Sequence, residues 1–283
     1  MFNFKADFKE KVIDPFIDSY RCGMTPNPCI ECNRHLKFTQ LHQKARELQC
    51  DVVVTGHYAR ITKDEQGYHL LKGKDAAKDQ SYVLYSLTQE QLAHTCFPLG
   101  EYTKEEIRRM AEEQGFFNAG KKDSQDICFI PDGDYRRFIE ETTGQKSTPG
   151  NFVDQEGNVL GIHKGYYCYT IGQRRGLGIS APQSLYVVEI RPEKNEVVLG
   201  SNEDLFHSHL TADHFNWIEQ VGPDEIIKAR IRYHQTEKEA TVRVLEDNRV
   251  EVDFLEPQRA ITKGQAVVLY RGDAVAGGGR IIG

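Results

Sequence analysis

Two cysteine-containing segments hold the residues best suited to chemistry. The first reads Thr25-Pro26-Asn27-Pro28-Cys29-Ile30-Glu31-Cys32-Asn33, and the second, far downstream, reads Asp123-Ser124-Gln125-Asp126-Ile127-Cys128-Phe129-Ile130. A thiolate that carries or delivers sulfur needs a second thiolate, distant in sequence but close in the fold, to resolve the intermediate. The two segments together therefore suggest an enzyme that handles sulfur.

Taken one at a time, the cysteines leave several interpretations open. Cys29 and Cys32 come immediately before an amphipathic helix, where free backbone N–H groups and the helix dipole favour a thiolate. A C-x-x-C pair also occurs as half of a zinc site, as a redox pair or as structural thiols, although no second C-x-x-C or C-x-x-H follows here to close a zinc site. Cys128 lies between apolar Ile127 and Phe129, which by itself is typical of a buried core cysteine.

From Phe2 to Gly283 the chain resembles the tRNA-specific 2-thiouridylases of bacteria and mitochondria, and the two cysteine segments carry the resemblance. The resemblance implies that Cys32 is the catalytic nucleophile and that Cys128 receives sulfur as a persulfide. It also implies that Asn27, Pro28 and Cys29 contact the target base. Many members of that family carry aspartate at the position of Cys29, as a candidate acid or base, and the thiol here departs from that pattern.

The reaction that the resemblance implies is the ATP-dependent 2-thiolation of the wobble uridine of tRNA. ATP with Mg²⁺ activates the C2 oxygen, the Cys128 persulfide supplies sulfur, and Cys32 forms a disulfide with Cys128 as the product is released. The sulfur comes from a persulfide carrier, which is a sulfur-relay or cysteine desulfurase protein. A second arrangement stays open, in which Cys29, Cys32 and Cys128 hold a 4Fe-4S cluster whose open iron binds hydrosulfide.

The resemblance also assigns contacts to RNA and nucleotide. It places tRNA contacts on His57, Lys78, Asp79, Gln80, Arg232, Tyr233 and Gln265, and an ATP contact on Gly56. The segment 228–234 alternates basic residues along a predicted strand and ends in an aromatic side chain that could stack on a base. The segment 169–178 combines paired arginines, which fork onto phosphates, with glycines that allow close backbone approach. Outside the resemblance, both segments also fit a solvated surface.

Hydrophobic periodicity predicts the elements that position these residues. A helical pattern follows the first cysteine pair, and 51–57 reads as a buried parallel strand whose end presents Gly56 and His57. Thr103 and Glu106 form a capping box, and a second helix is expected over 135–141. Short strands then follow at 185–190, 196–199, 241–244, 250–254 and 266–270.

The predicted fold is an α/β domain, the remainder of an ATP-pyrophosphatase or adenine nucleotide alpha hydrolase-like parallel sheet, followed by a small central domain and a C-terminal antiparallel β-barrel. We place the three domains at 1–144, 145–206 and 207–283. Members of the resembling family open with a strand, a Ser-Gly-Gly-Val-Asp-Ser loop and a helix that bind ATP, and this sequence contains no such loop. We therefore expect the first several dozen residues of the catalytic domain to be absent.

Two alternatives follow from that expectation. The chain could be a non-catalytic tRNA-binding fragment, or a subunit that needs an ATP-binding partner to complete its sheet. It could also be another ATP-pyrophosphatase-type synthetase that adenylates a small acid, which would need no distant thiol pair. The first alternative predicts poor solubility or co-purification with a partner, and the second predicts that thiol alkylation has no effect.

Composition limits the remaining classes. With 39% hydrophobic and 28% charged residues in 283, the chain is expected to be soluble and globular, and it has no apolar run near the roughly 20 residues of a membrane span. Its seven cysteines indicate reduced thiols rather than a secreted disulfide framework, so a cytoplasmic location is expected. The net charge of −6 gives no global attraction to nucleic acid, so RNA must bind local basic patches.

Overall fold

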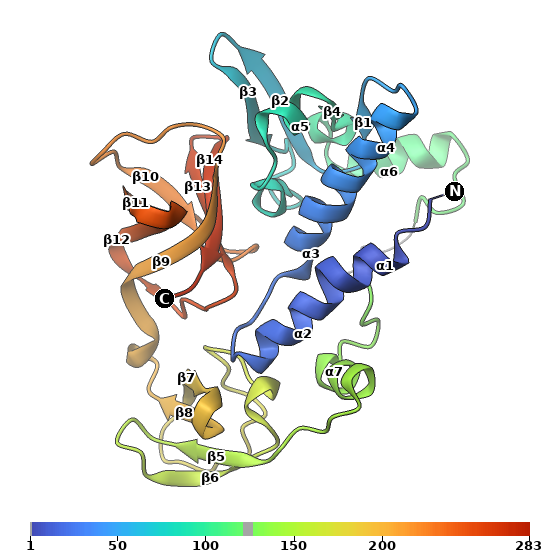
Figure 1. Ribbon diagram of the computed structural model, residues 1–283. Helices are drawn as coiled ribbons and strands as arrows, with labels where there is room; N and C mark the ends of the chain where they lie inside the picture. The colour runs from blue at the N-terminus through green and yellow to red at the C-terminus, as the bar shows by residue number, and fades with distance from the viewer. Residues whose placement is uncertain (1, 121–126) are drawn as a thin grey trace.

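The computed structural model describes residues 2–120 and 127–283, so Asp123 to Asp126 of the second cysteine segment lie outside the described residues. Two long helices cross the middle of the molecule, with a closed barrel on one side and a smaller four-stranded sheet below them (Figure 1). The expected fold class is confirmed: a helical region with a short parallel sheet, a central β domain and a C-terminal antiparallel barrel.

Each of the two long helices contains a π-helical segment. The first runs through α1 (Lys5–Phe8), η1 (Lys9–Ile13) and α2 (Asp14–Arg21), and the second through α3 (Pro28–Glu31), η2 (Cys32–Gln40) and α4 (Leu41–Glu47). In the part of the chain that the structure describes, neither these nor the other helices are long and apolar enough to span a membrane.

The parallel sheet is shorter than the sequence predicted. It consists of β1 (Val53–Val54) and β4 (Thr95–Cys96), which pair in parallel through Val53 with Thr95 and Val54 with Cys96. The expectation of a buried strand over 51–57 is wrong, because Val52 is 44% and Val54 is 59% exposed. Among the described residues, β1 pairs with β4 alone, so little covers its apolar side chains.

The C-terminal barrel is closed. Its sheet has the order β13-β10-β11-β12-β9-β14, and β13 pairs again with β14 to complete the ring. The strands are β9 (Phe206–Trp217), β10 (Ile227–Arg230), β11 (Lys238–Val244), β12 (Val250–Arg259), β13 (Ala266–Arg271) and β14 (Ala274–Ile281). Inward-facing apolar residues such as Leu210, Val252 and Leu269 fill its core.

A hairpin from the first region extends the barrel sheet. Strands β2 (Ala59–Asp64) and β3 (Gly67–Lys72) pair with each other, and Leu71 of β3 pairs with Ala274 of β14. The core beneath this joint mixes Leu70 and Tyr82 of the first region with Val268 and Tyr270 of the barrel. The first region and the barrel therefore share a hydrophobic core instead of packing as separate bodies.

The remaining elements surround these units. The capping box at Thr103 and the helix predicted after Cys128 are both confirmed. The helices are η3 (Ser81–Leu84), α5 (Gln89–Ala93), η4 (Pro98–Glu101), α6 (Lys104–Glu113), α7 (Tyr135–Thr143) and the short η5 (Tyr166–Cys168), η6 (Pro192–Lys194), η7 (Glu203–Leu205) and η8 (Glu246–Asn248). The central sheet has the order β6-β5-β8-β7, from β5 (Gly150–Val153), β6 (Val159–His163), β7 (Tyr186–Arg191) and β8 (Glu196–Gly200), with β5 and β8 parallel.

Candidate functional site: a thiol site beside the barrel

Cys29 and Cys32 lie inside the helix. The sequence had predicted that they come immediately before it. Asn27 is the N-cap and its Oδ1 accepts a hydrogen bond from the Cys29 backbone N–H at 3.2 Å, while Pro28 takes the first helical position. The buried side chains of Pro28 and Ile30 hold this first turn against the protein. Cys29 is left accessible at the surface and Cys32 is half-buried.

Cys128 is held near the helices by its neighbours. The Phe129 ring packs edge-on against Phe8 and Phe16 of the first long helix, with ring centroids 5.5 and 5.4 Å apart, and Ile130 is 2% exposed. Cys128 itself is exposed. Its interpretation as a buried core cysteine is therefore wrong, because the flanking apolar residues enter the core and turn the thiol outward.

Cys128 lies close enough to Cys29 and Cys32 to influence the ionisation of both. Cys29 keeps surface exposure, but the surrounding protein atoms remove part of the hydration of its thiolate. This loss of hydration is the main cause that raises the pKa of Cys29, and Cys128 and Cys32 raise it further. Burial also raises the pKa of Cys32, with a smaller contribution from Cys128. The expectation that the helix start favours thiolates at both positions is thus wrong in its net effect, because loss of hydration outweighs it.

One cation opposes these increases. Lys37, in η2, lowers the pKa of both Cys29 and Cys32. Its Nζ lies 3.4 Å from Nε2 of His57. The sequence analysis did not single out Lys37, because residues five apart lie on different faces of an α-helix. The signal that would have revealed it, a π-helical segment starting at Cys32, was not read from the sequence.

His57 is an internal residue. It is 7% exposed, and its ring lies between Phe38 and Phe97, with centroids 5.7 Å from each. Burial first, and then the charge of Lys37, lower the pKa of His57 to about 3. Direct contact between His57 and RNA does not match this environment, because both ring nitrogens already have partners inside the protein. Gly56, the predicted ATP contact, is exposed and lies two residues after the end of β1.

The approach to the cysteine helix is fixed to the barrel. The Thr25 N–H donates to the Lys263 carbonyl at 2.8 Å, and Gln265 Nε2 donates to the Thr25 carbonyl at 2.8 Å. Gly264, with φ +90°, lies so close that a Cβ there would meet Thr25 backbone atoms at 3.0 to 3.1 Å. Gln265 therefore does reach the cysteine segment from the barrel, as a positioning contact.

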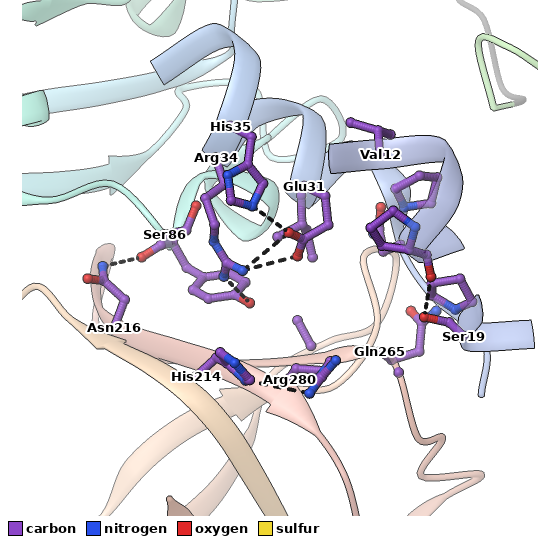
Figure 2. A pocket seen from close by; sticks show the side chains of 18 of the residues that line it. Val12, Ser19, Glu31, Arg34, His35, Ser86, His214, Asn216, Gln265 and Arg280 are labelled. Carbon is purple, nitrogen blue, oxygen red and sulfur yellow. Dashed lines mark hydrogen bonds and ion pairs between the residues drawn. The ribbon is translucent and has the colours of Figure 1, made fainter. Parts of the chain in front are cut away.

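A cavity of about 670 Å³ opens between this helix and the barrel. Figure 2 shows Glu31, Arg34 and His35 on the helical wall, facing His214 and Arg280 on the barrel wall. Glu31 pairs with Arg34 at 3.1 Å and with His35 at 3.2 Å. Three of the predicted base contacts line the same cavity: Asn27, Pro28 and Gln265.

A second cavity of about 490 Å³ lies where all three regions meet. Its lining includes Thr25 from the cysteine segment, Thr170 from the central domain, and Tyr233 and Gln265 from the barrel. The Tyr233 ring packs edge-on against His234 and Tyr82, with centroids 4.6 and 6.0 Å apart. This aromatic group gives the cavity a surface suited to a planar base.

Arg232 serves as a link between domains. Its Nη2 contacts the carbonyl oxygens of Ile171 at 3.3 Å and Ala260 at 3.0 Å, and Thr262 Oγ1 at 2.8 Å. The strand predicted over 228–234 ends at Arg230, so Arg232 and Tyr233 lie on the turn that follows β10. The predicted basic strand face is therefore wrong, because the chain turns at this point and the Arg232 guanidinium points to carbonyl groups.

The predicted triplet 78–80 sits over a buried ion network. Asp79 is 5% exposed, its Oδ1 accepts from the N–H groups of Gly73 and Ser81, and its Oδ2 accepts from the Ser81 hydroxyl. Asp79 Oδ2 also lies 3.4 Å from Arg230. Direct RNA contact by Asp79 does not match this position, because its carboxylate is enclosed and engaged. Lys78 is partly exposed, while Gln80 exchanges two hydrogen bonds with the Tyr58 backbone.

The network continues from Arg230 into the barrel. Glu237 pairs with Arg230 at 2.6 Å and with Lys72 at 2.9 Å, and both cations lie over the Tyr270 ring. Burial alone would raise the pKa of Glu237, but its bonds to Lys72 and Arg230 lower it overall. No sequence pattern predicts this group, because its members come from β3, β10 and the segment before β11.

The structure gives no support to the cluster alternative. Within 2–120 and 127–283, no group of three or more histidine, cysteine, aspartate or glutamate side chains is placed to hold a metal ion. The seven cysteines are free thiols.

Comparisons with known proteins define the class first. Three family models match in succession: a tRNA methyl transferase HUP domain over residues 1–132, a tRNA methyl transferase PRC-barrel domain over 136–201, and an aminomethyltransferase beta-barrel domain over 207–281. A HUP-type α/β domain followed by two β domains agrees with the arrangement in Figure 1.

Curated relatives then identify the family. The chain is 50% identical to proteins named tRNA-specific 2-thiouridylase MnmA from Lachnoclostridium phytofermentans and Carboxydothermus hydrogenoformans, and 49% identical to that of Clostridioides difficile. These matches cover 99% of this chain and 78 to 79% of each relative. The chain belongs to the tRNA-specific 2-thiouridylase family.

Proposed function

We propose that this protein is a tRNA-uridine 2-sulfurtransferase that transfers sulfur to C2 of the wobble uridine of tRNA. The observation that carries the proposal is that Cys128, from the far end of the first region, lies near enough to Cys29 and Cys32 to raise the pKa of both thiols. The helix that carries Cys29 and Cys32 also lines the first cavity, through Pro28 and Glu31. Two thiols that meet in this way can carry sulfur and then resolve the bond that held it. The relatives named above bear the name of this activity.

In the proposed reaction Cys128 carries sulfur as a persulfide. Its terminal sulfur forms a bond to C2 of the uridine, and the Cys32 thiolate attacks the remaining Cys128 sulfur. The sulfur–sulfur bond of the persulfide breaks, and a Cys32–Cys128 disulfide forms. The C2–O bond also breaks, so that the activated oxygen leaves with the nucleotide monophosphate and the transferred sulfur stays on the base. An external thiol reductant then restores both thiols, and a persulfide carrier protein reloads Cys128. The exposure of Cys128 suits access by such a carrier.

ATP with Mg²⁺, when bound, supplies the activation of the C2 oxygen as a leaving group. From this chain we assign Gly56 to the nucleotide side, since it is exposed at the carboxyl end of a parallel strand. An added Cβ at Gly56 would meet Leu99 at 3.4 Å, an ordinary contact, so exposure and not close packing supports this assignment.

The proposed tRNA surface runs along the two cavities. We assign Tyr233 to base stacking, Asn27 and Pro28 to the target base, and Lys78 to a phosphate. Asp79, Gln80, His57, Arg232 and Gln265 are assigned to positioning, since each has partners inside the protein. Arg174 and Arg175 of the central domain are exposed, and we assign them to phosphates.

A thiolation assay tests the proposal. Purified chain is incubated with unmodified tRNA, ATP, Mg²⁺ and a persulfide donor, and 2-thiouridine is measured in digested tRNA by mass spectrometry. Cys32→Ser and Cys128→Ser should each abolish product, whereas Cys50→Ser, which changes an exposed thiol outside both cysteine segments, should retain it. Full product from either of the first two variants would contradict the assigned roles.

Binding of tRNA, measured separately by filter retention, distinguishes the non-catalytic alternative. Wild-type chain that binds tRNA without forming thiouridine would favour a recognition subunit over an enzyme. Failure of both measurements would argue against the whole proposal.

A further inference from the structure

The helix that carries Cys32 has an unusual register. The N–H of Leu41 donates to the carbonyl of Leu36, five residues earlier, as expected for the π-helical segment η2. In an α-helix, residues five apart would project about 140° from each other. In the π-helical register they lie about one turn apart on the same side, so Lys37 is brought to the face of Cys32.

A neutral histidine holds the end of the Lys37 side chain. His57 stays uncharged near neutral pH because burial and Lys37 both oppose a second proton on its ring. A lysine ammonium can only donate, so His57 Nε2 accepts from it at 3.4 Å, and Nδ1–H donates to Thr55 Oγ1 at 2.8 Å. This tautomer fixes the direction of the ammonium without neutralising its charge.

Lys37 has no carboxylate partner among the described residues. The neighbouring carboxylate, Glu31, is engaged by Arg34 and His35 on the wall of the cavity. The charges that act on Cys32 are those of Lys37, which lowers its pKa, and Cys128, which raises it. The positive charge of Lys37 is therefore directed at the thiol site.

We propose that Lys37 is the counter-ion of the Cys32 thiolate and that His57 is the positioning residue that holds it there. The inference rests on the proposed function of this site for its biological meaning, and it names the residue that keeps the resolving thiol reactive. Only the thiolate is a nucleophile, and burial at Cys32 works against it. Lys37 offsets that burial, and the aromatic packing of His57 keeps the ammonium in place.

The test is the pH profile of thiol alkylation, which needs neither tRNA nor ATP, so its failure is distinct from failure of the proposed function. The rate of iodoacetamide addition at Cys32 is followed by peptide mass spectrometry from pH 6 to 11 in the full chain. Lys37→Met should move the midpoint upward by about one pH unit, which is about ten-fold slower alkylation at a fixed pH below the midpoint.

Matched variants separate charge from structure. Lys37→Arg keeps a cation and should restore most of the wild-type profile. Lys44→Met removes a lysine from the same helix that is paired with Glu47, and should leave the profile unchanged. His57→Leu should give an intermediate shift, because the ammonium loses its acceptor. Alkylation of half-buried Cys168, which unfolding would accelerate, reports whether each variant is folded.

The inference is overturned if Lys37→Met titrates like the wild type, or if Lys37→Arg shifts as far as Lys37→Met. In the first case Lys37 has no effect on the thiol, and in the second its shape matters and its charge does not. Should Lys37→Met fail to fold, Lys37→Gln gives the same comparison with a polar side chain of similar length.

Discussion

The ion network under the barrel and the thiol site differ in whether each cation has a carboxylate partner. Under the barrel, Asp79 and Glu237 face Lys72 and Arg230, with side-chain exposures between 2% and 19%. At the thiol site, Lys37 meets a neutral imidazole and thiols. Matched charges favour one fixed structure, whereas a cation without a carboxylate stays available to an anion that forms during chemistry.

The residues of the ion network have a structural role, whereas the cysteines and Lys37 have a role in reactivity. The ion network ties the 73–81 loop to β10, and so fixes Lys78 and Gln80 over the barrel. The thiol site is fixed by neutral contacts, which are the Asn27 cap, the Phe129 packing and the aromatic cage of His57. Loss of a matched charge should therefore reduce stability, and loss of Lys37 should change reactivity.

The largest stability effect is expected for Arg230→Met. This change leaves Asp79 buried without its cation and leaves Glu237 with Lys72 alone, which should cost about 3–5 kcal/mol of unfolding free energy. Urea unfolding followed by tryptophan fluorescence measures it. Arg230→Met combined with Asp79→Asn should cost less than the sum of the single changes, because the charges leave together. A loss under 1 kcal/mol for Arg230→Met would mean that the network is not the joint described here.

Arg232 tests an intermediate case, a cation whose partners are carbonyl and hydroxyl oxygens. Arg232→Ala removes one charge-assisted contact to the central domain, at Ile171, and two within the barrel, at Ala260 and Thr262, and should cost about 1.5–3 kcal/mol. Hydrogen exchange should show faster opening at Ile171 and Ala260. If Arg232 contacted phosphate instead, the variant would lower tRNA affinity and its salt dependence while leaving exchange unchanged.

The third effect is on acid stability, through His57. Its pKa is 6.5 unfolded and about 3 folded, so its stabilising contribution is complete above pH 6.5 and falls as the pH drops toward 3. The slope is about 1.4 kcal/mol per pH unit, or about 2 kcal/mol between pH 6.5 and 5. His57→Leu should flatten the fall in unfolding free energy over that window, measured by urea titration at each pH. His209→Leu, at an exposed position on β9, is the control, and equal slopes in both variants would argue against a buried neutral His57.

The elements that depend on local sequence patterns could be predicted from the sequence. The Thr103 capping box was predicted from one three-residue spacing, and the hairpin of β7 and β8 from two alternating runs around a turn. Period-two alternation after residue 207 predicted the barrel, and the family resemblance assigned roles to the cysteines of the two segments. These signals are local or motif-based, so they do not depend on how distant segments pack.

What the sequence could not reveal depends on contacts made at long range. The pairing of Leu71 with Ala274 and the burial of Asp79 under Arg230 join residues far apart in the chain. The π-helical register at Cys32 is equally hidden, since the residues fit an ordinary amphipathic helix. Sequence patterns therefore do not point to Lys37, and they predict His57 as a surface contact although it packs against Phe38.

Lys37→Met should have the smallest effect on unfolding free energy of these variants. It should also have the largest effect on the reactivity of Cys32. Lys37 is only half-buried and is bonded to a neutral ring, so Lys37→Met should change the unfolding free energy by about 0.5 kcal/mol or less. The same variant should slow Cys32 alkylation about ten-fold below the wild-type midpoint, as argued above. Unfolding by urea and alkylation on one preparation make the comparison direct. A stability loss as large as that of Arg230→Met would place Lys37 with the structural charges, and the distinction between the two polar groups would fail.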